Sequence, residues 1–357
     1  MAKILYGVAG EGFGHSSRSE LTGRYLIDAG HDVVFAASHK SFNYLRQLFN
    51  SRVKPVHGLR FYYHDGRVDP FRTVLQNLSS YRKGREINQC LFSEIAQEFR
   101  PDLVISDFEP FSAWWAWRNR VPCISIDHEH LLTCCAVETE RALWKERTMA
   151  QIVTRGYHTF ADAYIVLNFF KVPVKNRSAS LVPPVVRNAV LQTHIRYGEH
   201  ILVYSTDSGD LIKKRLFDIL SRCVEYRFYI YGFDLAEERG NCLFKKTSTK
   251  FFLNDLASCR AMVATAGFSL LSECIHFRKP MLLMPVRDQY EQAVNAYYVH
   301  KLRMGQRINI LTVEVLRSFL DQIEIFSFNH PSIVFPDNAE YFRTLNHIFH
   351  KLGVSTL

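Results

Sequence analysis

The sequence predicts an α/β protein made of two doubly wound domains, each with a parallel sheet. Short apolar strands alternate with helices along the chain, a proline-containing stretch separates two such series, and 357 residues is about twice the length of an ordinary domain. This alternation is typical of parallel sheets covered on both faces. We expect an N-terminal domain over residues 1–186, a C-terminal domain over 187–335, and a helix within 336–357 that packs back onto the first domain.

The first series begins with an apolar strand at 3–8, a glycine-rich loop and a helix at 16–29. Gly30 stands where a helix C-terminus is expected. A further helix is predicted at 111–120, and further strands are predicted at 32–37, 101–107, 122–127 and 164–167. Residues 171–190 contain Pro173, Pro183 and Pro184 and show no clear period, which predicts an interdomain linker.

The second series repeats the alternation of strands and helices. Its strands are predicted at 201–204, 226–231, 262–265 and 280–284. Its helices are predicted at 211–221, 253–257, 267–276 and 290–302, and the final helix is predicted at 338–352. In open sheets of this kind, ligands bind beyond the carboxyl ends of the strands. The loops that follow the strands are therefore where chemistry is expected.

Composition narrows the functional classes. Lys and Arg number 44 against 35 Asp and Glu, and this excess is spread over both halves. A diffuse positive charge suits anionic small molecules or an anionic membrane surface, and we expect no nucleic-acid partner. Eight cysteines without a C-x-x-C pair predict reduced thiols in a cytoplasmic protein, with peripheral membrane contact left open. The aromatic and basic segment 60–85 suits either an acceptor or membrane contact, or a solvated helical face.

The loop after the first strand contains the candidate catalytic base. Its glycines allow close approach of a ligand, but their spacing matches neither a dinucleotide fingerprint nor a P-loop. His15 lies beside the helix N-terminus and can act as a general base near neutral pH. Gly12 and Gly14 are predicted to contact the acceptor. A helix-capping histidine is the alternative.

Polar residues also follow two later strands of the first domain. Asp107 ends one strand, where it could orient and charge-stabilise His15, or simply cap a helix. Glu109 is a further candidate for acceptor contact. His128 and His130 follow the next strand, and a single H-x-H is weak as a metal signal. We expect no metal site and assign both histidines to acceptor contact, with a plain loop as the alternative.

The second domain carries the strongest motif. Gly267 stands between a strand and a helix, so a diphosphate can approach the N–H groups of Phe268 and Ser269. The helix dipole favours its negative charge. Glu273 follows six residues after the glycine and can accept hydrogen bonds from both ribose hydroxyls. This spacing predicts a nucleotide-binding site.

These motifs resemble those of GT-B glycosyltransferases, in particular the family 28-like group of UDP-sugar-dependent transferases and the lipid-linked N-acetylglucosaminyltransferase of peptidoglycan synthesis. That group has glycine and glutamate at the spacing of Gly267 and Glu273, and an acid-Gln-x-x-Asn-Ala element matched by 291–296. The group's other motifs are matched by the segments 10–18 and 205–209 and by Asp107. Within the group, the chain looks most similar to poorly characterised microbial members. The resemblance implies two Rossmann-like domains facing a central cleft, with a nucleotide-sugar substrate and no cofactor.

The same resemblance implies a set of donor contacts. The residues assigned on this basis are Ser205, Thr206, Ser208, Gly209, Phe251, Thr265, Gly267, Phe268, Ser269, Glu273, Glu291 and Gln292. Plant-type members have histidine where this chain has Thr265, so a hydroxyl or backbone N–H groups must contact the phosphate here. Arg287 and Asp288 make the next loop longer than in plant-type members.

The expected function is inverting, metal-independent transfer of a sugar from a UDP-sugar to an unidentified acceptor hydroxyl, in cell-surface polysaccharide or glycolipid synthesis. His15 would take the acceptor proton, Asp107 would hold the imidazole, and the helix after Gly267 would stabilise the leaving diphosphate. The sequence contains no Asp-x-Asp pair that could hold a divalent metal, which agrees with metal-independent transfer. A nucleotide-sugar hydrolase is the first alternative, because 12–18 also resembles the G-x-G-H-x-x-R loop of such hydrolases. A non-catalytic nucleotide-sugar-binding protein is the second.

Overall fold

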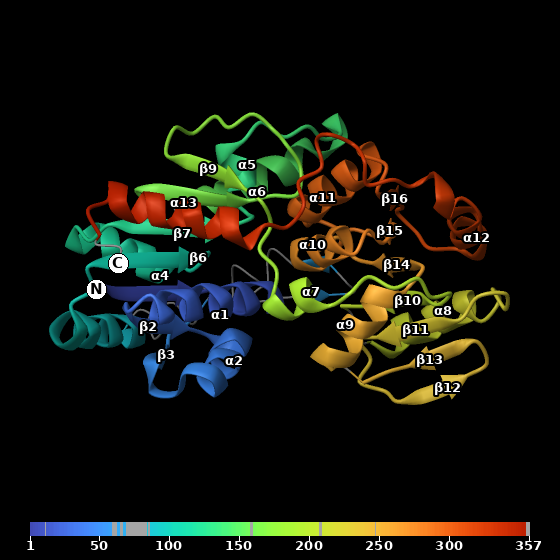
Figure 1. Ribbon diagram of the computed structural model, residues 1–357, viewed down its shortest axis with the longest axis horizontal. Helices are drawn as coiled ribbons and strands as arrows, with labels where there is room; N and C mark the ends of the chain where they lie inside the picture. Colours follow the sequence, from blue (N-terminus) through green and yellow to red (C-terminus); the bar gives the residue numbers. More distant parts are fainter. Residues whose placement is uncertain are drawn as a thin grey trace. The chain divides into compact units, whose positions relative to one another are not determined.

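The computed structural model describes residues 1–10, 12–58, 63–64, 67–68, 84, 86–157, 160–206, 209–246 and 248–354. The chain divides into two compact units, described here one at a time. Unit 1 comprises Met1–Asn168, Val172–Arg187 and Asp337–Leu357, and unit 2 comprises Phe169–Lys171 and Asn188–Pro336. Each unit contains a sheet flanked by helices (Figure 1). The predicted α/β class is confirmed.

Over its described residues, unit 1 contains a seven-stranded parallel sheet in the order β3-β2-β1-β6-β7-β8-β9. The strands are β1 (Lys3–Val8), β2 (Asp32–Ala37), β3 (Val53–Pro55), β6 (Leu103–Asp107), β7 (Cys123–Asp127), β8 (Ala163–Leu167) and β9 (Ala179–Val182). A small antiparallel pair joins β4 (Tyr63–His64) and β5 (Arg67–Val68). Chain order reverses at β1, between its neighbours β2 and β6, and a doubly wound sheet binds ligands at such a switch point.

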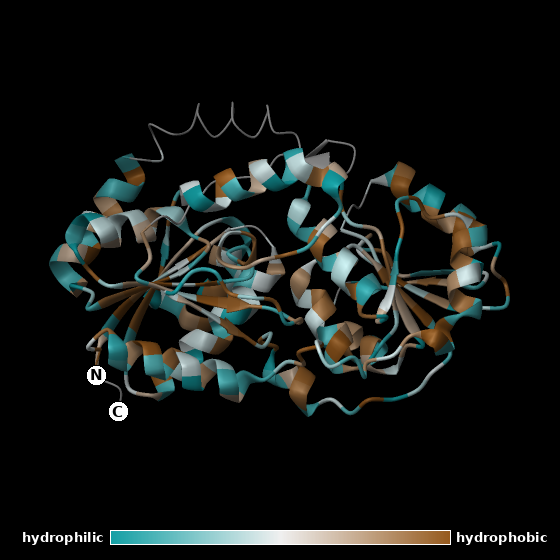
Figure 2. Ribbon diagram, turned by 90° about the horizontal axis from the view of Figure 1, so that it is seen from above, coloured by the Kyte–Doolittle hydropathy of each residue, from teal (hydrophilic) through white to brown (hydrophobic). Residues whose placement is uncertain are grey.

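The helices of unit 1 connect these strands, and the strands themselves are mostly apolar (brown in Figure 2). The helices are α1 (Phe13–Asp28), α2 (His39–Phe49), α4 (Pro110–Asn119), α5 (Leu131–Cys134), α6 (Trp144–Tyr157) and α13 (Asn338–Lys351). The C-terminal α13 belongs to this unit: Tyr341 Oη lies 2.8 Å from Thr22 Oγ1, and Asn346 donates to Tyr25 Oη at 2.6 Å.

Residues 171–190 are not the simple linker that the sequence predicts. They contain β9, which pairs in parallel with β8 and forms the edge of the sheet. The strand is short and its first three residues are only half-buried, as befits an edge strand. It therefore shows no apolar run that periodicity could detect, and Pro183 and Pro184 follow it immediately.

Unit 2 contains, over its described part, a seven-stranded sheet in the order β12-β13-β11-β10-β14-β15-β16, in which only the β12–β13 pair is antiparallel. The strands are β10 (Ile201–Tyr204), β11 (Phe228–Tyr231), β12 (Glu237–Arg239), β13 (Cys242–Phe244), β14 (Ala261–Ala264), β15 (Met281–Leu283) and β16 (Gly305–Arg307). β12, β13 and β16 are only three residues long, too short for an apolar run to predict them from the sequence.

The helices of unit 2 are α7 (Asn188–Gln192), α8 (Asp210–Leu220), α9 (Thr249–Ser258), α10 (Phe268–His276), α11 (Tyr290–Lys301) and α12 (Val313–Asp321). The central strand β10 lies between β11 and β14, so the loops after β10, β14 and β15 leave the same edge of the sheet. Among the residues that the structure describes, no helix is long and apolar enough to cross a membrane.

Candidate active site

The helix that contains His15 begins three residues earlier than the sequence predicts. α1 starts at Phe13, so His15 lies in its first turn, and Gly12 is the N-cap residue. Gly12 has a φ of 84°, a left-handed conformation that side-chain-bearing residues rarely adopt. Gly14 lies inside the first turn, where its low helix propensity hid the helix start from the sequence analysis. The turn directs His15 toward the carboxyl end of β6.

The structure brings His15 and Asp107 together. His15 Nδ1 lies 2.6 Å from Asp107 Oδ1, and the carboxylate of Asp107 is fully buried. Arg18 also binds this carboxylate: its Nε donates to Oδ2 at 2.8 Å and its Nη2 donates to Oδ1 at 2.5 Å. Ser19 Oγ adds a bond to Oδ2 at 3.2 Å. Since an ionised carboxylate only accepts, His15 must carry its hydrogen on Nδ1, which leaves Nε2 to receive a proton.

The charges around this cluster favour ionised forms. Burial raises the pKa of Asp107, but Arg18 and His15 outweigh it and hold the pKa below its ordinary value. Burial lowers the pKa of His15, while Asp107 and Glu129 outweigh it, so the net pKa is raised above the ordinary value. Arg18 opposes that rise. Such a perturbed histidine, paired with a buried acid, is typical of an active site.

Glu129 is a site residue that the sequence analysis missed. It follows β7, and its Oε1 lies 3.5 Å from His15 Nε2. The D-H-E-H segment 127–130 contains two histidines, but the carboxylate between them is the group that faces His15. His15 therefore lies between two carboxylates, Asp107 at Nδ1 and Glu129 at Nε2.

The structure argues against acceptor contact by Glu109, His128 and His130, whose side chains are almost fully buried. The Glu109 carboxylate caps α4 by accepting from the backbone N–H groups of Phe111 and Ser112. His128 Nδ1 lies 2.7 Å from the carbonyl oxygen of Leu167, and His130 Nδ1 lies 2.7 Å from Asp127 Oδ2. Their partners hold these side chains inside unit 1, away from solvent.

In unit 2, the predicted diphosphate motif lies at the start of α10. Gly267 is the N-cap residue, with a φ of −69° that any residue can adopt. A Cβ built on it would meet no described atom within 4 Å, so neither backbone conformation nor packing requires glycine. Close approach of a ligand to the N–H groups of Phe268 and Ser269 does favour it. Ser269 and Glu273 are four residues apart on this helix and so share a face.

Gln292 is held by neighbouring loops, which argues against the direct donor contact that the resemblance implies. Its Oε1 accepts from the backbone N–H groups of Ala266 and Val286, both at 3.1 Å, and its Nε2 donates to Gln289 Oε1. Asn295 donates to the carbonyl of Ala266 and to the side chain of Glu291. Gln292 therefore ties the β14–α10 loop to the β15–α11 loop.

The other predicted donor contacts are distributed over unit 2. Ser205 and Thr206 follow β10, Gly209 precedes α8, and Thr265 follows β14, so these residues flank the strand edge where α10 begins. Phe251 lies in the first turn of α9, longer than predicted, and is 61% exposed. Ser208 lies outside the described residues, as does most of the segment 60–85.

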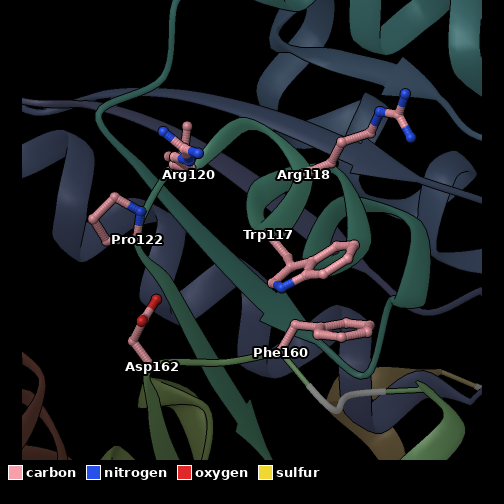
Figure 3. A pocket seen from close by; sticks show the side chains of 7 residues that line it. Trp117, Arg118, Arg120, Pro122, Phe160 and Asp162 are labelled. Atoms are coloured by element: carbon pink, nitrogen blue, oxygen red, sulfur yellow. The ribbon is translucent and has the colours of Figure 1, made fainter.

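A surface pocket of about 640 Å³ lies elsewhere in unit 1. Figure 3 shows Trp117 lying against Phe160, with Arg120 and Asp162 also at its lining. These residues precede β7 and β8, at the amino ends of the strands, whereas His15, Asp107 and Glu129 adjoin carboxyl ends. The pocket is thus separate from the candidate site. Over the described residues, no group of three or more His, Cys, Asp or Glu side chains is arranged to hold a metal ion.

Comparison with known proteins agrees with this arrangement. A family model described as glycosyl transferase family 1 matches residues 2–324. An uncharacterised glycosyltransferase of Methanosarcina mazei is 22% identical over 342 residues, covering 87% of each chain. The solved structure of LpCGTa in complex with UDP has a TM-score of 0.66 at 12% identity, covering 99% of this chain and 100% of that one.

A second solved structure shows the same likeness. Phytolacca americana UGT2, complexed with UDP-2fluoro-glucose and pterostilbene, has a TM-score of 0.62 at 16% identity, covering 99% of this chain and 100% of that one. At such low identity the likeness shows the fold alone, which is the GT-B fold that the motifs predict.

Proposed function

The chain belongs to glycosyl transferase family 1, and from this premise we propose that it moves a sugar from a nucleoside-diphosphate sugar, with UDP as the expected carrier, to an acceptor hydroxyl with inversion of the anomeric carbon. The observation that carries the proposal is the state of His15: Asp107 holds Nδ1, and Nε2 lies on the side of the ring that faces Glu129. A base with one directed nitrogen suits a single direct displacement, which inverts the anomeric centre.

The proposed reaction assigns a role to each unit. The acceptor oxygen attacks the anomeric carbon while its proton passes to His15 Nε2, and Asp107 stabilises the imidazolium that forms. The bond to the diphosphate breaks, and the N–H groups at the start of α10 stabilise the charge that develops on the leaving group. This helix terminus supplies stabilisation that a divalent metal supplies in other transferases, so we propose that the reaction needs no metal.

A hydrolase is the second candidate, and one observation favours it. The Gly12–Arg18 loop, which resembles that of sugar-nucleotide hydrolases, has its arginine bound to the same carboxylate as its histidine. A base built in this way could activate water as well as a hydroxyl. Both candidates share the donor site, so only the acceptor separates them.

The experiment that tests the proposal begins with a thermal-shift screen of nucleotide sugars. A ligand present at 100 times its dissociation constant should stabilise unit 2 by about 2.7 kcal/mol. The best binder is then incubated with acceptor extracts, with and without EDTA. Formation of a glycosylated product in EDTA supports the proposal, and sustained donor turnover without any acceptor supports the hydrolase. Cytoplasmic location and peripheral membrane contact stay predictions.

A further inference from the structure

Glu129 faces the nitrogen of His15 that takes the proton in the proposed reaction. Its Oε1 lies 3.5 Å from His15 Nε2, and its side chain is 19% exposed. Its other oxygen accepts the backbone N–H of His128 at 3.1 Å. The part-buried carboxylate is thus held beside His15, with one oxygen directed at the base.

The position of a reacting hydroxyl follows from the protonation of His15. Because the Nδ1 hydrogen is bonded to Asp107, the acceptor proton can pass only to Nε2. The acceptor oxygen must therefore come within about 2.6–3.2 Å of Nε2. Atoms next to that oxygen are then also next to Glu129 Oε1.

When His15 is neutral, the Glu129 carboxylate oxygen that faces it needs a hydrogen-bond donor from another group. While His15 Nε2 carries a lone pair, it faces Glu129 Oε1 with no hydrogen between them. A part-buried carboxylate oxygen that is served only by limited solvent is less well satisfied than one that receives a directed donor. A second donor on the acceptor, next to the nucleophilic hydroxyl, would satisfy Oε1 at the moment when His15 must be neutral.

We propose that Glu129 determines acceptor specificity by binding a second hydroxyl adjacent to the nucleophilic one, an inference that rests on the proposed function. The two hydroxyls of a vicinal diol can donate at the same time to His15 Nε2 and to Glu129 Oε1. The acceptor class is therefore a polyol or saccharide with adjacent hydroxyls. An alcohol without this second donor gives the part-buried Glu129 oxygen no directed hydrogen bond and is a poorer substrate.

A purely electrostatic role for Glu129 makes a different prediction. If Glu129 only adjusts the basicity of His15, its removal changes the rates of all acceptors by the same factor. If it binds the second hydroxyl, its removal changes the ratio between two acceptors. That ratio is independent of the pKa of the base when both acceptors are measured at one pH.

The experiment compares trans-1,2-cyclohexanediol with trans-2-methoxycyclohexanol, which lacks the second O–H. The full-length enzyme is given the best-binding nucleotide sugar, and kcat/KM is measured for both alcohols. A site that binds a substrate hydroxyl rejects analogues without it, and for this part-exposed carboxylate we expect about a 10-fold preference or more for the diol. Glu129→Ala should abolish the preference, whereas Glu98→Ala, which alters an exposed acid elsewhere in unit 1, should keep it.

Equal ratios in the wild type and in Glu129→Ala would overturn the inference. If neither alcohol reacts, the NMR signals of the His15 imidazole decide: the diol should shift them in the wild type but not in Glu129→Ala, and no shift with the diol also overturns it. A failure of the proposed function gives a different result: His15→Ala would then retain sugar transfer, whatever the ratio of kcat/KM between the diol and the methoxy alcohol. Transfer that depends on His15 without a diol preference would reject only this inference.

Discussion

The guanidinium of Arg18 binds both carboxylate oxygens of Asp107. The two bonds measure 2.8 and 2.5 Å, and Arg18 Nη2 lies 3.1 Å from His15 Nδ1. Asp107 is thus shared between a permanent cation and a titrating one. Arg18 keeps the buried carboxylate ionised and at the same time opposes the rise in the pKa of His15. A base with a less elevated pKa is more often neutral, as a proton acceptor must be.

Loss of Arg18 should destabilise unit 1. Arg18→Met leaves the Asp107 carboxylate buried with only His15 as a charged partner, and breaking a buried pair typically costs about 3–5 kcal/mol. The double variant Arg18→Met/Asp107→Asn should lose less than the sum of the two single variants, since no unpaired charge remains. Urea unfolding of the four proteins measures this coupling, and strictly additive losses would show that the pair does not interact.

The pH dependence of kcat/KM should reveal the effect of Glu129 on the pKa of His15. The pKa of His15 is raised, and the base works when neutral, so kcat/KM should increase with pH through a value above the ordinary 6.5. Glu129→Gln removes one of the two carboxylates that raise this pKa, so the increase should occur at lower pH. Kinetics from pH 5 to 9, with Glu98→Gln as the control, provide the measurement. An unchanged profile would mean that Glu129 does not act on His15.

His15→Ala should lower sugar transfer by about 10²–10⁴-fold, the usual contribution of a positioned base. UDP affinity should hardly change, because the candidate donor residues belong to unit 2 and His15 to unit 1. Asp107→Asn should lose less, since the imidazole keeps a neighbour but not its charge partner. Turnover and calorimetric UDP binding measure the two effects separately. Near wild-type turnover by His15→Ala would remove it from the mechanism.

Glu273 should contribute to nucleotide binding. If its carboxylate accepts from the ribose hydroxyls, Glu273→Ala should weaken UDP by about 1.5–3 kcal/mol, the range for hydrogen bonds to charged groups. Glu324→Ala, which removes an acid that is 89% exposed in the same unit, should bind UDP normally. Calorimetric titration of UDP into the wild type and both variants measures the effect. Equal UDP affinities of the wild type and Glu273→Ala would count heavily against a ribose contact by Glu273.

Gln292 should act by holding the two donor loops together and not by contact with a sugar. Gln292→Ala leaves the N–H groups of Ala266 and Val286 without their side-chain partner, at a cost of about 1–3 kcal/mol each where they are buried. The variant should therefore melt at lower temperature and bind plain UDP more weakly. A direct sugar contact alone would weaken only the UDP-sugar, so comparing UDP with UDP-sugar distinguishes the two roles.

Much of the fold could be predicted from the sequence because its central strands are buried on both faces. β1 and β2 have the predicted bounds, since an unbroken apolar run bounded by glycine or charge leaves little alternative. The edge strand β9 escaped prediction because a half-exposed strand needs no such run. Because the hydrophobic pattern of a sequence follows burial, it identifies the buried central strands and misses the half-exposed edge strands.

For the site, the sequence by itself determined the local motifs: a glycine-rich loop that contains His15, and Gly267 before α10. These follow from backbone conformation and helix ends, which neighbouring residues control. Only the tertiary structure decided that Arg18 shares Asp107, that Glu129 faces His15, and that Glu109 and Gln292 are occupied by backbone N–H groups. His15 and Asp107 are 92 residues apart, and parallel pairing of β1 with β6 brings them together. Side-chain partners across such a sheet edge depend on register and rotamer, which no local pattern encodes.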